Sequence, residues 1–134
     1  MEQMVQFNIV AILVATVVAY ALGAIWYMPK LFGNAWMSAL GKTPEELGSP
    51  VRAMSLNFFA TLLTAIVLAW LLAITGAQTA WEGFYVSLIA SIGLLGTSMY
   101  ADHLFAATPI KLLLITGGYR IVHIVLMGTI LGAW

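Results

Sequence analysis

The stretch that decides the fold is Gly23-Ala24-Ile25-Trp26-Tyr27-Met28-Pro29-Lys30-Leu31-Phe32-Gly33-Asn34-Ala35-Trp36. A long apolar run ends here at an aromatic pair, a proline and the first lysine of the chain. Tryptophan and tyrosine have apolar rings with polar tips, so they settle at the headgroup level of a bilayer, and lysine is enriched on the cytoplasmic side. The stretch therefore predicts a membrane boundary at the cytoplasmic face.

The composition of the whole chain is that of an integral membrane protein. Of its 134 residues, 63% are hydrophobic and 7% are charged, whereas soluble domains carry roughly 25% charged residues. The absence of cysteine excludes disulfides, thiolate metal sites and a cysteine nucleophile. The sequence has no basic patch of the kind that would indicate a nucleic-acid partner. Only Glu2 and Gln3 precede the first long apolar run, which disfavours a cleavable signal peptide.

Four apolar runs are long enough to cross a bilayer, which needs roughly 20 helical residues. They cover residues 5–28, 51–75, 83–102 and 110–133. Lipid offers no hydrogen bonds to the backbone, so each run is expected to be a helix, and the lack of strand-like alternation disfavours a barrel. The predicted fold is an all-α integral membrane four-helix bundle, with residues 1–134 as one transmembrane domain.

The basic residues predict the orientation. Lys30, Lys42 and Arg52 flank the first loop and Lys111 flanks the third, whereas the second loop and both ends carry none. The positive-inside rule therefore places loops 29–50 and 103–109 in the cytoplasm. Both termini are then expected on the outer side of the cell (inner) membrane, opposite the cytoplasm.

The first loop is the only sizeable polar segment, and its first half has apolar residues at helical spacing: Leu31, Phe32, Ala35, Trp36, Ala39 and Leu40. This spacing predicts a short helix on the membrane interface with its apolar face toward the lipid. Thr43-Pro44-Glu45-Glu46 has the pattern of a capping box with proline in the first helical position. Gly48 is expected to end that turn.

The sequence contains a candidate internal repeat. Residues 22–32 align with residues 95–105 through shared Leu, Gly, Tyr, Leu and Phe. A similar helix start follows each copy, Ser49-Pro50-Val51-Arg52 or Thr108-Pro109-Ile110-Lys111, in which Ser or Thr would cap the helix. We interpret the halves as duplicated hairpins of like orientation, related by an axis along the membrane normal. Composition bias alone is the alternative.

Small residues spaced four apart predict where the helices pack, because they let helix backbones approach closely in lipid. The rows are Ala11, Ala15, Ala19 and Gly23; Asn57, Thr61, Ala65, Ala69 and Ala73; Ser87 and Ser91, then Gly93 and Thr97; and Gly128 and Gly132. They predict a compact bundle. A second copy of the chain is an alternative partner for some of these rows.

Arg120 is the least expected residue, because it lies near the middle of the fourth span, where a charge costs roughly 2.5–3.5 kcal/mol. Its long side chain is expected to reach toward the cytoplasmic side, with Asp102 as its counter-charge. The candidate intramembrane polar cluster comprises Arg120, His123, Asp102, Asn57 and Thr116. A structural anchor is favoured over a functional charge, because structural ion pairs also place charges inside proteins.

No catalytic, cofactor-binding or metal-binding residue is predicted. His103, His123 and Asp102 lack the spacing of metal ligands on one helix. His123 is instead expected to be hydrogen-bonded within the bundle. Glu82 is expected to lie at the N-terminus of the third helix. No catalytic triad, phosphate loop or haem pattern can be assembled.

The pattern Gly-x-x-Trp-Tyr-x-Pro-x-x-Phe-Gly-x-x-Trp resembles the signature of the DUF1761 family, small membrane proteins of unknown function. The residues that carry it are Gly23, Trp26, Tyr27, Pro29, Phe32, Gly33 and Trp36. Similarity at Phe7-Asn8, Glu82-Gly83, Gly118-Tyr119 and Met127-Gly128 extends the resemblance over essentially the whole chain.

The chain departs from the family pattern at two places. After Phe105, where an acidic residue and then arginine are expected, it has Ala106-Ala107-Thr108. Arg120 and His123 also do not belong to the pattern. The resemblance implies four spans and no assigned activity, and it adds no catalytic residue.

These observations favour a non-enzymatic membrane protein with a structural or accessory role. Its expected partners are the lipid bilayer and a second copy or another membrane protein. The alternative is a small oligomeric transporter or channel, which would need at least a dimer, because four helices line no roomy path. The first span also lacks the acidic residue on which small four-helix exporters depend. An enzyme acting on lipid or isoprenoid substrates ranks only third, because the sequence lacks acidic metal-binding clusters.

Overall fold

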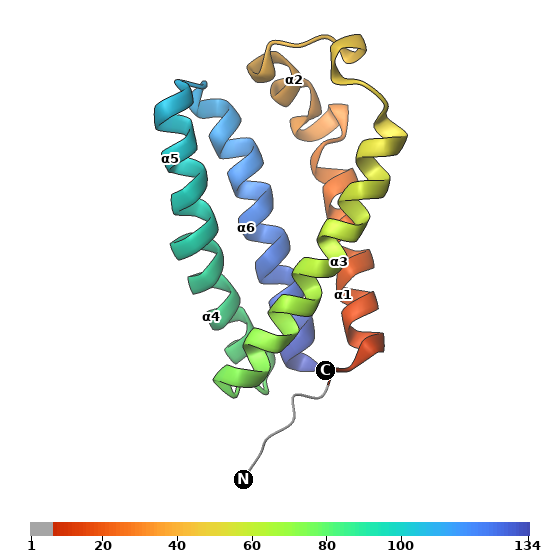
Figure 1. The fold of residues 1–134 in the computed structure, drawn as a ribbon, viewed down its shortest axis with the longest axis vertical. Coiled ribbons are helices and arrows are strands. Elements are labelled where there is room, and N and C mark those ends of the chain that lie inside the picture. Colours follow the sequence, from red (N-terminus) through yellow and green to blue (C-terminus); the bar gives the residue numbers. More distant parts are fainter. Residues whose placement is uncertain (1–6) are drawn as a thin grey trace.

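The computed structural model describes residues 7–134, and the regular elements in that range are all helical (Figure 1). The helices are α1 (Ile9–Trp26), α2 (Asn34–Leu40), α3 (Pro50–Thr75), α4 (Ala80–Ala90), α5 (Thr97–Ala106) and α6 (Ile110–Ala133). Two π-helical segments, Pro29–Gly33 and Ser91–Gly96, and a 3₁₀ turn, Pro44–Leu47, complete the order. The predicted all-α class is confirmed.

Within residues 7–134, four helices are long and apolar enough to cross a membrane, as the sequence predicts. They are α1, α3, α6 and one continuous helix, Ala80–Ala106, made of α4, the second π-helical segment and α5. The predicted start of the first span at residue 5 lies outside the described residues. The third helix continues past its predicted end at Asp102, so the third loop shrinks to residues 107–109.

The two ends of the bundle differ (Figure 1). One end carries the reversal after α1, the first loop with α2, and the short turn between α5 and α6, and we call it the loop end (residues 27–49 and 107–109). The other carries the turn at residues 76–79 and the C-terminus, and we call it the terminal end.

The first loop has much of the predicted local structure. The Glu46 carboxylate accepts hydrogen bonds from the Thr43 N–H at 3.2 Å and from the Thr43 hydroxyl at 3.0 Å, which confirms the capping box. Gly48 follows the 3₁₀ turn with φ 79° and ends it, as expected. The predicted short helix exists as α2, but its first residues belong to the preceding π-helical segment.

The helix starts confirm one predicted cap and the predicted place of Glu82, and they contradict a second cap. Ser49 Oγ accepts from the N–H of Arg52 at 3.4 Å at the start of α3. Glu82 in the first turn of α4 accepts from the N–H of residue 78 at 3.1 Å. The predicted cap at Thr108 is wrong: its hydroxyl lies 3.0 Å from His103 Nδ1, and the cap position of α6 falls on the following proline. The tight turn gives this hydroxyl an imidazole partner in place of the helix N–H groups.

The closest helix packing joins α4 to α6 through glycines. A Cβ on Gly83 would meet the carbonyl oxygen of Gly128, and a Cβ on Gly128 would lie 2.8 Å from the carbonyl oxygen of Gly83. A Cβ on Gly132 would lie 3.0 Å from the Cα of Gly83. The predicted row Gly128 and Gly132 is therefore a backbone contact. Gly83 belongs to the same contact, although the predicted row on its helix starts at Ser87.

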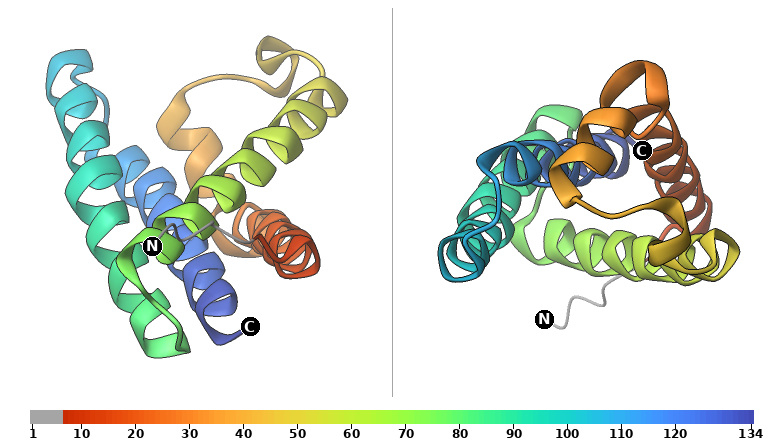
Figure 2. Two further views of the ribbon diagram at one scale, coloured as in Figure 1. Left: turned by 60° about the horizontal axis from the view of Figure 1, so that its bottom comes forward. Right: turned by 90° about the horizontal axis from the view of Figure 1, so that it is seen from above.

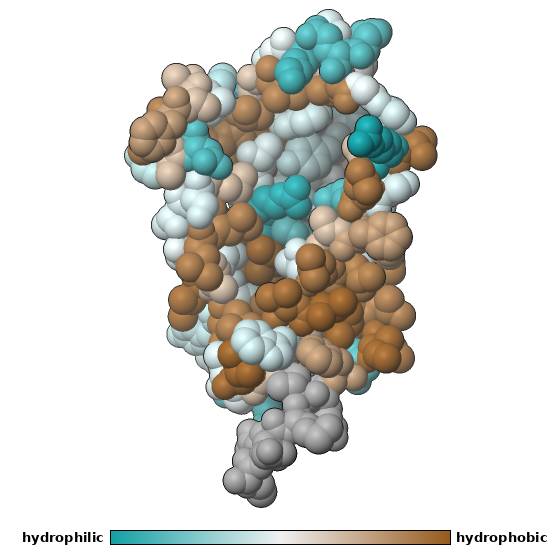
Figure 3. Space-filling view, in the orientation of Figure 1, coloured by the Kyte–Doolittle hydropathy of each residue, from teal (hydrophilic) through white to brown (hydrophobic). Residues whose placement is uncertain are grey.

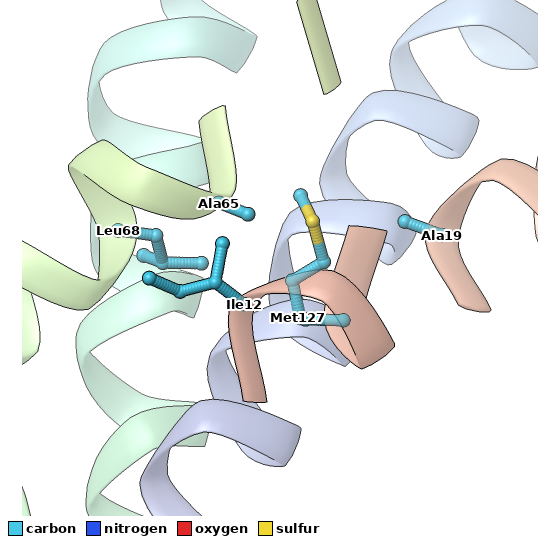
Figure 4. Close-up of a cluster of buried hydrophobic side chains, with 6 residues drawn as sticks. Ile12, Ala19, Ala65, Leu68 and Met127 are labelled. Atoms are coloured by element: carbon cyan, nitrogen blue, oxygen red, sulfur yellow. The ribbon is translucent and has the colours of Figure 1, made fainter. Parts of the chain in front are cut away.

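The buried core lies where α1, α3 and α6 meet (Figure 4). It consists of Ile12, Ala15, Ala19, Ala65, Leu68 and Met127. The predicted alanine row of α1 is buried as expected.

The predicted small-residue row of α3 is only partly buried. Thr61 and Ala65 are buried, but Ala73 is exposed and Leu72 takes the buried position. An α-helix has 3.6 residues per turn, so a strict four-residue spacing drifts away from the contact over several turns. The third row also fails at its far end, where Gly93 and Thr97 are exposed.

The bundle opens toward the loop end. The buried residues of α3 begin at Thr61, and Val51 to Leu56 are exposed. Figure 2 shows this part of α3 diverging from α5 and α6. Figure 3 shows a recess between them, with hydrophilic side chains at its base and both hydrophobic and hydrophilic ones around it. We call this recess, bounded by residues 50–60 of α3, α5 and the first half of α6, the hollow.

The two copies of the candidate repeat have different structures. The first ends α1 and turns at Pro29, whereas the second lies within one continuous helix. Phe32 packs on Trp26 with ring centroids 4.8 Å apart, but its counterpart Phe105 is 94% exposed. The duplication therefore stays a prediction from the sequence.

Candidate functional site

The signature stretch folds into a tight reversal at the loop end. Proline has no N–H and disfavours a helical conformation in the preceding residue, and Met28 before Pro29 is accordingly extended, with ψ 145°. The N–H of Gly33 then donates to the carbonyl of Met28 at 3.0 Å, which folds the π-helical segment back onto the end of α1. A Cβ on Gly33 would lie 2.9 Å from the Met28 carbonyl carbon, so the reversal needs glycine at this position.

Trp26 connects this reversal to α6. Its indole Nε1 donates a hydrogen bond to the carbonyl oxygen of Ile115 at 3.1 Å. A backbone carbonyl has two lone pairs, so it can accept the indole N–H in addition to a bond within its own helix. The indole would lie 3.4 Å from a Cβ on Gly118, so the absence of a side chain there lets it pack close to α6.

Tyr119 is buried at the contact between α1 and α6. Its hydroxyl donates a long hydrogen bond of 3.4 Å to the carbonyl of Ala19 and would lie 2.7 Å from a Cβ on Gly23. Tyr27 approaches its ring edge to face, with the centroids 5.4 Å apart. Together with the neighbouring rings these residues form what we call the aromatic cluster: Trp26, Tyr27, Phe32, Trp36 and Tyr119.

Arg120 and His123 border the aromatic cluster. The Arg120 guanidinium carbon lies 5.4 Å from the centroid of the Tyr119 ring, within the range of a cation–π contact. The His123 ring is buried and stacks on Tyr119 with centroids 4.9 Å apart. Its Nδ1 donates to the carbonyl of Arg120 at 2.7 Å. The expectation of a hydrogen-bonded histidine is confirmed, with its own helix as the partner.

Asp102 and Thr116 lie together in a different place. They line a groove of about 190 Å³ between α5 and α6. The Thr116 hydroxyl donates to the carbonyl of Leu112 at 2.8 Å, and Asp102 is exposed. In the described chain Arg120 lies over Tyr119 while Asp102 faces this groove, so the expected ion pair between Arg120 and Asp102 is not formed.

Asn57 is the last member of the candidate polar cluster. It is half-buried on α3, one turn before the first buried residue of that helix. Its backbone carbonyl accepts the Thr61 hydroxyl at 2.8 Å. The structure thus places His123 beside Arg120 and Thr116 with Asp102, and it places Asn57 on the helix that faces them across the bundle.

The residues described do not assemble a metal site: no three His, Asp or Glu side chains within residues 7–134 come close enough to share an ion. The two histidines each have another partner. His103 faces the Thr108 hydroxyl and His123 bonds its own helix.

The model of a protein family described as "Protein of unknown function (DUF1761)" matches residues 10–132. The chain belongs to the DUF1761 family. The match covers nearly the whole chain, including both the signature stretch and the Gly118-Tyr119 pair. No curated protein and no solved structure matches this DUF1761 protein.

In this DUF1761 protein the signature residues build one junction of α1, the reversal and α6. The glycines permit close approach: Gly23 to Tyr119, Gly33 to the reversal and Gly118 to Trp26. The aromatic residues fill the junction, and Pro29 turns the chain into it. Arg120 lies at the edge of this junction, over the Tyr119 ring.

One contact of the junction could not be found from the sequence. A backbone acceptor such as the Ile115 carbonyl leaves no mark in the residue types. Gly83, in contrast, had a usable signal, because it continues the four-residue spacing of Ser87 and Ser91 backward by one turn.

Proposed function

We propose that this DUF1761 protein is a multi-pass protein of the cell (inner) membrane with a non-enzymatic, structural or accessory role. The observation that carries the proposal is the dense packing of the terminal half of the bundle. Ala15, Ala65 and Met127 are fully buried there, and Gly83 contacts Gly128 at the backbone. A solute path would have to cross this half, and protein interiors packed in this way hold few voids larger than a water molecule.

The loop end supports a role in partner binding. α2 packs against α6, and Trp36 on it meets Tyr27 edge to face at 5.5 Å. The capping box of Thr43 and Glu46 orders the following turn. A surface that is ordered before binding loses less conformational entropy when a partner arrives.

The N-terminal half of α3 supplies a second surface, within the membrane. Its exposed apolar side chains include Val51, Met54, Leu56 and Phe59. In a bilayer such a face contacts lipid, a second copy or another membrane protein. Helix association in lipid depends on van der Waals packing and interhelical hydrogen bonds, so a partner would need a complementary helix face.

We propose that the loop end faces the cytoplasm and the terminal end faces outward. Every Lys and Arg of the chain belongs to the loop end or to the adjoining half of a long helix. Cytoplasmic loops carry an excess of these residues.

Flux measurements on sealed proteoliposomes test the absence of transport. We expect the purified chain to conduct protons and ions no faster than protein-free liposomes. A saturable flux that Arg120→Gln abolishes would contradict the accessory role.

Photo-cross-linking in cells tests for a partner. A photoreactive residue in place of Phe59, 65% exposed on α3, is expected to give a discrete cross-linked product. Ile89, 68% exposed on α4, is the matched control and is expected to give none. A product of twice the mass of the chain would identify a second copy as the partner. If neither position gives a product, the accessory role through α3 is wrong.

A small oligomeric transporter or channel is the second candidate. The hollow favours it, because its base is hydrophilic and the half-buried Arg120 lies on the adjoining helix (Figure 3). Since the terminal half is packed, transport would require a second copy or a movement of α3. The flux measurement separates the two candidates.

A further inference from the structure

Arg120 carries a charge in the middle of a membrane-spanning helix without an acidic partner in the described chain. Such a charge is costly in a bilayer and needs a counter-ion or water. The described carboxylates are engaged or placed elsewhere. Glu46 accepts from Thr43, and Glu82 accepts from the N–H of residue 78 and the hydroxyl of residue 79 at the terminal end. Asp102 faces the groove between α5 and α6. Glu45 lies in the exposed turn after α2.

The surroundings of Arg120 fix its position without neutralising it. The guanidinium lies over the Tyr119 ring, and aromatic faces attract cations but carry no net charge. Side chains of a helix lean toward its N-terminus, which for α6 is the loop end. The guanidinium is therefore directed toward the open half of the bundle, where the hollow lies (Figure 3).

The hollow is open to the side, toward the lipid. The views of Figures 1 and 2 agree that α3 and α5 diverge toward the loop end. Both of these helices also carry exposed apolar side chains: Leu56 on α3 and Leu104 on α5 are each 58% exposed. A hydrophilic base between helices that expose apolar side chains suits a molecule with a polar head and apolar chains.

The excess of positive charge at the loop end favours a negatively charged headgroup. All five cations of the chain belong to the loop end and the adjoining helix segments, with three carboxylates, Glu45, Glu46 and Asp102, among them. The excess of positive charge raises the local concentration of anionic headgroups. Arginine binds phosphate with two parallel hydrogen bonds, which lysine cannot match.

We propose that Arg120 binds the phosphate of an anionic phospholipid that enters the hollow sideways from the leaflet at the loop end. The headgroup lies at the hydrophilic base, and its acyl chains lie along the exposed apolar side chains of α3 and α5. Asn57, half-buried on α3, supplies a second polar side chain on the opposite wall. This site does not depend on the accessory role, since a bound lipid is compatible with an accessory protein or a transporter.

Lipid titration of the purified full chain in mild detergent tests the site. The probes are phosphatidylglycerol, phosphatidylcholine and inorganic phosphate, and the readout is lipid retained in native mass spectrometry. We expect phosphatidylglycerol to bind at least tenfold more tightly than phosphatidylcholine. Protection of the site by inorganic phosphate at equal concentration would show a free anion instead and overturn the lipid assignment.

Two charge-matched variants locate the binding. Arg120→Gln is expected to weaken phosphatidylglycerol binding at least tenfold, whereas Lys42→Gln removes the same charge from the exposed loop and is expected to weaken it no more than threefold. Equal losses would mean that only the overall charge matters, which would overturn the site.

A measurement on the unaltered chain keeps the test independent of folding of the variants. A photoactivatable phosphatidylglycerol is expected to label peptides of α3, α5 and α6 that bound the hollow, and unlabelled phosphatidylglycerol should compete with it. Labelling confined to residues 29–50, or to the outward faces of α1 and α4, would overturn the proposal. This outcome is distinct from failure of the accessory role, which the flux and cross-linking measurements decide.

Discussion

The indole nitrogen of Trp26 and the carbonyl oxygen of Ile115 lie 3.1 Å apart and form a hydrogen bond between α1 and α6. The bond connects the end of the first span to the second turn of the last. It therefore holds the signature junction against the helix that carries Tyr119 and Arg120.

Trp26→Phe tests the contribution of this bond. Phenylalanine keeps the aromatic packing on Phe32 but removes the N–H donor. We expect the free energy of unfolding to fall by about 1 kcal/mol, the usual net value of a hydrogen bond and similar to values within membranes. Reversible unfolding in mixed detergent micelles measures the change. The control Trp81→Phe alters an exposed indole on α4 and should cost clearly less; equal losses would show that ring size rather than the bond matters.

Gly83→Ala and Gly128→Ala test the backbone contact of α4 and α6. A methyl group at either position would meet atoms of the facing helix, so the helices must separate. We expect each variant to lose about 1–3 kcal/mol of unfolding free energy, as overpacking of a dense contact does. Gly93→Ala is the matched control, because no atom lies within 4 Å of its Cβ position. If the control loses as much, the loss reflects helix conformation and not the contact.

The capping box predicts a pH dependence in the first loop. Hydrogen bonds from the N–H and then the hydroxyl of Thr43 lower the pKa of Glu46 below its usual 4.5. The box therefore contributes fully above pH 4.5, and its contribution disappears as the pH falls through the lowered pKa. Carboxyl ¹³C titration by NMR should give a midpoint below 4.5, which Thr43→Val should raise by removing the hydroxyl. A midpoint that the variant leaves unchanged would contradict this assignment.

Single-cysteine labelling tests the orientation, because the chain has no native cysteine. We expect an impermeant maleimide to label Gln78→Cys in intact cells, since residue 78 lies in the exposed turn at the terminal end. Lys42→Cys at the loop end should react only after the membrane is permeabilised. The reverse pattern would place the loop end outside and contradict the positive-inside prediction.

Phe32→Ala and Phe105→Ala compare the two copies of the candidate repeat. Phe32 packs on Trp26, whereas Phe105 is almost fully exposed at the loop end. We expect the first substitution to cost about 1 kcal/mol more in unfolding free energy, because only Phe32 loses an aromatic pair. Equal costs would indicate that the two positions are structurally equivalent after all.

The sequence by itself determined the four long helices and some of the hydrogen bonds at their starts. Four apolar runs had to become helices because lipid satisfies no backbone group. The side chains of Ser49 and Glu82 accept hydrogen bonds from N–H groups three and four residues away. These signals are local, so they can be found in the residue order. The cap at Thr108 failed because its partner, His103, belongs to the preceding helix.

Only the tertiary structure decided which polar residues meet and where the bundle opens. Arg120 lies over Tyr119 and not beside Asp102, because the rotation of α6 against α5 fixes which side each residue faces. That rotation is set by the contact of Gly83 with Gly128 and by the packing of Tyr119 against α1. Such contacts join residues far apart in the chain, and their geometry depends on backbone approach rather than on the type of any one residue.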